Sequence, residues 1–236
     1  MKDKILSICI GTNNGQLNGS KNDSIIFFNF LYYLYENNNF KKYWLKPYVF
    51  FDESVNMIKI CSYIKDLNIN FKYLLIFYSG HGYQEGIINI PNSLNEFNKV
   101  TDTEFIKKIS DTVNNDIELY LILDCCFGGS FKLLPYNRIK KVNLISSTNI
   151  NEEASEGITR LNNIINLREI VLKDKLNIHE NTIIMGIFTY NFIYILSRLN
   201  NYSIKNWKNV IEDVDNQKIW NNIKKLAKQT PFIKWE

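Results

Sequence analysis

The chain has 236 residues, of which 45% are hydrophobic and 14% aromatic, and this composition excludes a largely disordered protein. Its net charge is only +4 and its lysines are scattered, so nothing indicates a nucleic-acid partner. Four cysteines, two of them adjacent, are too few for a disulfide scaffold and favour reduced thiols. We therefore expect one globular domain over residues 1–236, in the reducing cytoplasm.

The N-terminal half alternates between strand and helix patterns. In chain order it predicts a strand at 5–10, a helix at 22–36, a strand at 47–51, a helix at 53–67 and a strand at 73–78. A further helix is expected over 101–113, with Thr101 as its N-cap, because Glu104 stands at the spacing of a capping box. The first strand begins directly after Lys2, Asp3 and Lys4, so we expect no signal peptide.

The C-terminal half continues the alternation. It predicts strands at 121–123 and 142–146, a helix at 183–198, a last helix ending at 227 and an edge strand at 231–235. The longest apolar tract, 183–196, is shorter than the ~20 residues of a membrane span, so no membrane partner is expected. The polar stretch 149–182 predicts a mobile or cleavable connection. The alternation of strands and helices along the whole chain indicates an α/β fold with a mostly parallel sheet.

Two strands of this sheet each end in a reactive side chain. His81 stands between two glycines just after the run 73–78, and Cys125 and Cys126 follow the run 121–123. Carboxyl ends of parallel strands lie at one edge of a sheet, so we expect these residues to meet. A thiol attacks a carbonyl as thiolate and needs an imidazole to take its proton, so the pair predicts a thiol hydrolase. The N–H of Gly82 is then available to a substrate carbonyl.

The adjacent cysteines cannot share one role, because successive side chains at a strand end point in opposite directions. One is a candidate nucleophile and the other is packing, and spacing alone leaves open which is which. The second histidine, His179, lies in a polar segment and is interpreted as a solvated surface residue.

Tyr78 to Gly82 and Asp124 to Gly129 resemble the two catalytic motifs of the metacaspases, a family of caspase-like cysteine peptidases. Three further segments, 17–24, 186–189 and 229–231, are similar to family segments in the same order. The resemblance implies a caspase-like fold, in which a mostly parallel six-stranded sheet has helices on both faces, here without a prodomain. It also implies that Cys126 is the nucleophile, that His81 is the base, and that the N–H groups of Gly82 and Cys126 hold the oxyanion.

The resemblance further implies cleavage after Arg or Lys. The family's acidic primary pocket matches Asp23 and Asp124 here, with Ser20 and Ser79 as polar neighbours. Two converging carboxylates repel each other unless a cation joins them, which gives the preference its physical basis. A helix cap is the structural alternative for Asp23. Cleavage after Asp, as in true caspases, is disfavoured because Leu17 and Asp124 stand where caspases have Arg and Gln.

Many metacaspases are activated by calcium through aspartates between the two motifs and just after the Cys. Here the only carboxylates in residues 84–98 are those of Glu85 and Glu96, and residues 131–134 contain no carboxylate. Hard cations need several oxygen ligands, so we expect no metal, no cofactor and no calcium activation.

The resemblance implies polypeptide substrates with a basic residue before the scissile bond, a monomeric enzyme, and a role in cell-death or stress-type proteolysis. Basic residues in the stretch 149–182 are candidate autoprocessing sites, namely Arg160, Arg168, Lys173 and Lys175. The alternative is a catalytically inactive caspase-like module that pairs with or regulates an active relative. The presence of both His81 and Cys126 argues against it.

Overall fold

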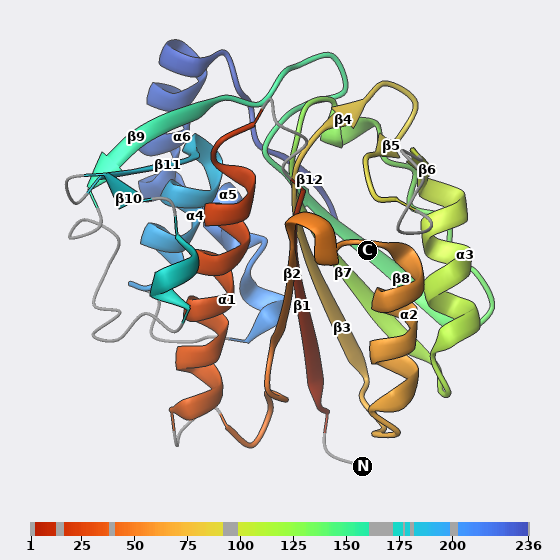
Figure 1. The fold of residues 1–236 in the computed structure, drawn as a ribbon. Coiled ribbons are helices and arrows are strands. Elements are labelled where there is room, and N and C mark those ends of the chain that lie inside the picture. Colours follow the sequence, from red (N-terminus) through yellow and green to blue (C-terminus); the bar gives the residue numbers. More distant parts are fainter. Residues whose placement is uncertain are drawn as a thin grey trace.

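A computed structural model describes residues 3–12, 17–37, 41–91, 99–160, 172–176, 178–179, 182–198 and 203–235. Its centre is a six-stranded sheet in the order β12-β8-β7-β3-β1-β2 (Figure 1). These strands are β1 (Ile5–Gly11), β2 (Tyr48–Phe51), β3 (Tyr73–Ser79), β7 (Ile117–Asp124), β8 (Ile139–Ser146) and β12 (Phe232–Lys234). Five of them are parallel, and β12 pairs antiparallel with β8, so the sheet is mixed. The predicted α/β class and the predicted edge strand at 231–235 are confirmed.

Helices cover both faces of the sheet. The helices are α1 (Ser20–Glu36), α2 (Met57–Asp66), α3 (Asp102–Thr112), α4 (Ile187–Leu196), α5 (Asn209–Glu212) and α6 (Val214–Ala227). In Figure 1, α2 and α3 lie on one face, and α1 lies with α4, α5 and α6 on the other. Short 3-10 turns occupy Asp52–Ser54, Gly128–Ser130, Lys173–Lys175 and Ile204–Asn206. Thr101 caps α3 as expected, since its Oγ1 accepts the Glu104 N–H at 3.2 Å.

The alternation of strand side chains explains why the apolar runs are continuous. Within β3, Leu75 and Phe77 pack in the core beneath α1, whereas Leu74 and Ile76 pack in the core beneath α2 and α3. Phe77 stacks on Phe27 of α1 with the ring centroids 4.4 Å apart. A strand buried on both faces has no polar side to show in its sequence.

Two small antiparallel sheets lie at the carboxyl ends of the main strands. One contains β4 (Gly82–Tyr83), β5 (Ile87–Ile88) and β6 (Val100–Thr101). The other contains β9 (Glu156–Arg160), β10 (Ile178–His179) and β11 (Thr182–Gly186), with β11 in the middle. The prediction of a helix from 183 is therefore wrong over its first turn, because residues 182–186 pair with β9 and the helix begins at Ile187. Likewise the helix predicted from 53 begins at Met57, after a 3-10 turn.

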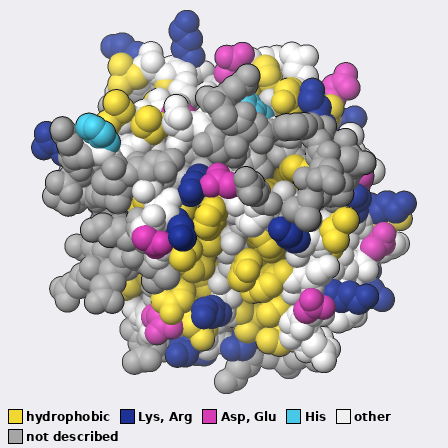
Figure 2. Space-filling model, viewed as in Figure 1, with side chains coloured by type: hydrophobic (Ala, Val, Ile, Leu, Met, Phe, Trp, Pro, Cys, Tyr) yellow, Lys and Arg dark blue, Asp and Glu magenta, His cyan; other side chains and the backbone are white. Residues whose placement is uncertain are grey.

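One face of the molecule carries charged side chains of both signs. On the face shown in Figure 2, the Lys and Arg side chains alternate with Asp and Glu side chains around apolar stripes, and no continuous basic area is visible. None of the helices in the described ranges combines the length and apolar character that crossing a bilayer requires.

Candidate active site

The register of the central strands brings His81 and Cys126 together. Ser79 at the end of β3 pairs with Asp124 at the end of β7, and the Gly80 N–H donates to the Asp124 carbonyl at 3.3 Å. His81 and Cys126 each stand two residues beyond this pair, and both line one small pocket of about 40 Å³. The two residues therefore lie together at this edge of the sheet, as predicted.

Gly82 is required where the His81 turn and the Cys126 turn touch. A Cβ added at Gly82 would lie 2.0 Å from the Cys126 carbonyl oxygen and 2.8 Å from Cys125 Sγ. Phe127, the next residue along, takes a left-handed φ of 55°, and its N–H donates to the Glu152 carbonyl at 2.7 Å. This conformation turns the chain sharply after Cys126 and is stabilised by a contact from the loop after β8.

The two cysteines lie in different environments. The Cys125 side chain is 1% exposed and belongs to the core beneath α2 and α3. Cys126 is half-buried and lines the pocket, where its Sγ accepts the Ala154 N–H at 3.3 Å. Burial raises the pKa of both thiols, and the Ala154 N–H lowers the pKa of Cys126 in part. Of the two, only Cys126 presents its thiol to the pocket, and a raised pKa means that a base has to take its proton.

The His81 turn is fixed through its backbone. The Tyr78 hydroxyl, which is fully buried, donates to the His81 carbonyl at 2.8 Å, and the Asn89 N–H reaches the same oxygen at 3.1 Å. The imidazole is half-buried beside the ring of Tyr83, with centroids 6.5 Å apart. These contacts hold the turn and leave the ring partly accessible.

Asp23 and Asp124 point into the same pocket from α1 and β7. Asp23 Oδ2 accepts the Ser79 hydroxyl at 2.8 Å, and its Oδ1 accepts the Gly186 N–H at 2.8 Å. Asp124 Oδ2 accepts the Thr189 hydroxyl at 2.6 Å and the Thr189 N–H at 3.2 Å. The helix-cap alternative for Asp23 is wrong, since its carboxylate contacts β3 and β11 and makes no capping bond within α1.

The two carboxylates meet at Gly186, where a Cβ would lie 2.1 Å from Asp124 Oδ2 and 3.0 Å from Asp23 Oδ2. Burial, and then the Asp124 charge, raise the pKa of Asp23 well above its usual range. Burial also raises the pKa of Asp124, against the hydrogen bonds from Thr189. Within the described ranges, neither carboxylate forms an ion pair with a Lys or Arg. A cation entering the pocket would relieve this repulsion.

Glu156 is a third carboxylate of the pocket that sequence reasoning missed. Its Oε1 accepts the Gly19 N–H at 2.7 Å and its Oε2 accepts the Asn18 N–H at 3.2 Å. Its charge raises the pKa of both Asp23 and Asp124. It lies in the polar stretch interpreted as a connection, where no periodicity or motif marked it.

The other predicted residues are distributed as follows. Ser20, which is buried, and Leu17, which is half-buried, both line the pocket. Arg160 is exposed at the end of β9, Lys175 is exposed, Lys173 begins a 3-10 turn, His179 is exposed on β10, and Arg168 lies outside the described residues. Over the described residues, no three His, Cys, Asp or Glu side chains are grouped so as to hold a metal ion.

Comparison with known proteins adds no family to this picture. The chain matches no protein-family model, and no curated protein is significantly similar to it in sequence.

Proposed function

We propose that the protein is a cysteine endopeptidase that hydrolyses peptide bonds after Arg or Lys, with a caspase-like, specifically metacaspase-like, catalytic domain. The observation that carries the proposal is one pocket that contains a thiol, an imidazole and three carboxylates. The two motifs that resemble the metacaspase motifs supply His81, Cys126 and Asp124 to it. A buried cluster of carboxylates without an internal cation is costly, and such clusters are typical of functional sites.

The reaction follows from the chemistry of the two reactive groups. The His81 imidazole takes the proton of the Cys126 thiol, and the thiolate attacks the scissile carbonyl carbon. The resulting oxyanion accepts hydrogen bonds from the N–H groups of Gly82 and Cys126. The imidazolium then gives its proton to the leaving amine as the C–N bond breaks and a thioester remains. Water, deprotonated by the same imidazole, hydrolyses the thioester and restores the thiol.

The carboxylates supply the specificity. A guanidinium or ammonium group beside Asp23 and Asp124 forms charge-assisted hydrogen bonds and relieves their mutual repulsion, and Glu156 adds a third negative charge. An Asp side chain in the same place would add a further buried negative charge. Ser79 and Ser20 complete the polar wall. We propose that the enzyme acts as a monomer in the cytoplasm, without metal or cofactor, on polypeptide substrates in cell-death or stress-type proteolysis.

One observation favours the alternative of an inactive binding module. The Ala154 N–H contacts the Cys126 sulfur, so the segment before β9 lies directly on the thiol. The carbonyl group of a bound peptide therefore has to displace or bypass the Ala154 N–H before the Cys126 thiol can attack it. An arginyl chloromethylketone, which alkylates a reactive active-site thiol, separates the two functions: an inactive module leaves Cys126 unmodified under all conditions.

The proposal is tested by a panel of fluorogenic peptides that differ only in the residue before the scissile bond. We expect turnover with Arg and Lys, none with Asp, and none with any peptide in Cys126→Ala. Cleavage of the Asp peptide alone, or unchanged activity of Cys126→Ala, would overturn it. Edman or mass analysis of the purified enzyme tests autoprocessing at Arg160, Arg168, Lys173 and Lys175, and an intact active enzyme would show that cleavage there is not required.

A further inference from the structure

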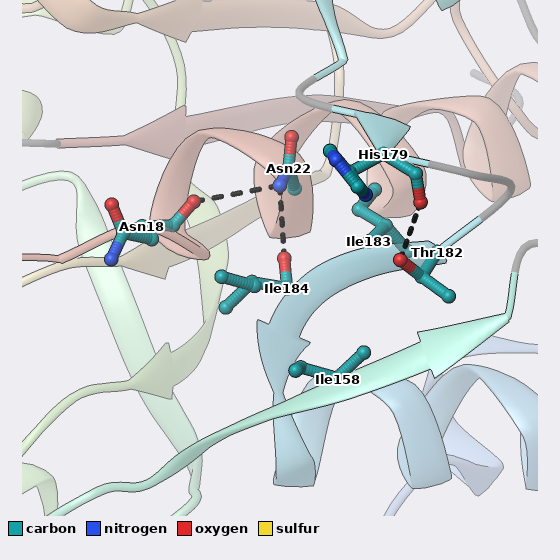
Figure 3. Close-up of a pocket in the computed structure, with 7 residues that line it drawn as sticks. All are labelled: Asn18, Asn22, Ile158, His179, Thr182, Ile183 and Ile184. Atoms are coloured by element: carbon teal, nitrogen blue, oxygen red, sulfur yellow. Dashed lines mark hydrogen bonds between the residues drawn. The ribbon is translucent and has the colours of Figure 1, made fainter.

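The pocket that contains Asp23, Asp124 and Glu156 is the carboxylate pocket. A second pocket, of about 420 Å³, adjoins it, and the proposed peptidase chemistry assigns no role to this second pocket. It is lined by Asn18, Asn22, Ile158, His179, Thr182, Ile183 and Ile184 (Figure 3). The Asn22 amide donates to the Ile184 carbonyl at 2.9 Å and to the Asn18 carbonyl at 3.4 Å, so α1 and β11 are linked at its floor. The Asn22 side chain thus connects two of the elements that form the pocket.

The β9 and β11 pair joins the two pockets along one face. Glu156 pairs with Gly186, and both line the carboxylate pocket. Two residues later in β9 and two residues earlier in β11, Ile158 pairs with Ile184, and both line the second pocket. Because alternate residues of a strand share a face, these pairs are successive rungs of the same face, about 6.6 to 6.8 Å apart.

The second rung contains an exposed apolar side chain. Ile158 is 76% exposed, whereas Ile183 of the neighbouring strand points into the core. In Figure 3, Ile158 and Ile184 lie side by side on the two strands, with His179 and Thr182 at the far end of the pocket. The first pair carries a carboxylate, and the second pair carries two aliphatic side chains. An acidic site and an apolar site therefore follow one another along this face.

We propose that this second pocket binds an apolar side chain of the substrate, two residues upstream of the basic residue at the cleavage site. The proposal rests on the proposed peptidase function. In an extended peptide, side chains two residues apart lie on one side at the same spacing as the rungs of β9 and β11. The contact between Ala154 and Cys126 places the thiol before Glu156 along this segment, so the upstream part of the substrate continues toward Ile158. The preferred substrate sequence is therefore an aliphatic residue, then any residue, then the basic residue at the cleavage site.

Two measurements test the proposal. The first compares cleavage of Ile-Gly-Arg and Gly-Gly-Arg aminomethylcoumarin amides. The second compares binding of the corresponding fluorescein-labelled peptide amides to Cys126→Ala by anisotropy. We expect the Ile peptide to be favoured about tenfold in both kcat/KM and Kd. Ile158→Asp and the milder Ile158→Thr should reduce this ratio to near one, and Ile58→Asp, at a 62% exposed isoleucine of α2, should preserve it.

The outcomes separate the two claims. Cleavage of both peptides with a ratio near one in the native enzyme overturns the subsite and leaves the peptidase standing. Selective binding of the Ile peptide without any cleavage supports the subsite and overturns the peptidase. A preference that survives both Ile158 substitutions also overturns the subsite, and absence of both binding and cleavage overturns both claims.

Discussion

Asp23→Asn should raise the stability of the unliganded protein while it weakens cleavage after Arg. The substitution keeps the shape of the side chain, and an amide can still pair with the Ser79 hydroxyl and the Gly186 N–H. It removes one of two buried charges that repel each other. It also removes a charge-assisted partner of the substrate cation, so opposite effects are expected on folding and on catalysis.

The magnitude for catalysis follows from the hydrogen bond that is lost. A hydrogen bond to a charged group contributes about 1.5 to 3 kcal/mol, which corresponds to a loss of about 10- to 150-fold in kcat/KM for Arg peptides. For stability the sign follows from the raised pKa of Asp23. The folded protein binds the proton more tightly than the unfolded chain, so ionisation costs stability as the pH rises above the unfolded value of about 3.9. The gain in Tm should be largest at neutral pH and shrink toward about pH 4.

Thermal unfolding across this pH range and steady-state cleavage of an Arg peptide measure the two effects on the same preparation. Asp116→Asn is the matched control, because Asp116 forms an exposed ion pair with Lys140 far from the pocket. Its effects should stay within about 0.5 kcal/mol and leave cleavage unchanged. The reasoning is refuted if Asp23→Asn lowers the Tm at neutral pH, or if it leaves the cleavage of Arg peptides intact.

Four further predictions concern the pocket and its surroundings. Cys125→Ala should keep turnover and lower the free energy of unfolding by about 1 to 2 kcal/mol because Cys125 is buried in the core, as urea titration can show, and loss of turnover there would contradict the assignment of the nucleophile. Gly186→Ala places a Cβ against Asp124, so it should cost about 1 to 3 kcal/mol of stability and impair Arg cleavage; unchanged kinetics would mean that the carboxylates do not face the substrate. Because burial raises the pKa of Cys126 and of Asp124, kcat/KM for Arg peptides should rise as the pH increases through neutrality, and a flat profile would contradict this. Cleavage should be equal in EDTA and in calcium, and a tenfold activation by calcium would contradict the expectation of metal independence.

The main sheet was predictable because its strands are marked by continuous apolar runs that end in glycine or in reactive residues. The run before His81 and the run before Cys126 pair in the structure, and their ends meet in register. The alternation of strands and helices was enough to predict this neighbourhood.

The start of α4 was not predictable from periodicity. Residues 182–196 form an almost unbroken apolar run, and such a run fits a buried strand as well as a buried helix. Ile183 and Met185 face the core at a period of two, while the following residues wind into the helix from Ile187. Gly186 marks the change, because its position admits no side chain beside the two aspartates.

Glu156 was missed because its role depends on tertiary contacts. Its partners, the N–H groups of Asn18 and Gly19, are far away in the sequence, and a backbone donor leaves no trace in a residue pattern. The Ile158 pocket was missed for the same reason, since an exposed isoleucine in a polar stretch has no significance until β9 pairs with β11.

The central claim is that the Cys126 thiol reacts with a peptide whose basic side chain lies in the carboxylate pocket. Intact-mass and peptide-mapping mass spectrometry, after treatment with an arginyl chloromethylketone and with its aspartyl counterpart, tests this claim most directly. We predict one adduct of the arginyl reagent, mapped to Cys126, absent in Cys126→Ala and strongly slowed in Asp23→Asn. Labelling by the aspartyl reagent at an equal rate, or a native protein that the arginyl reagent leaves unmodified at Cys126, would contradict it.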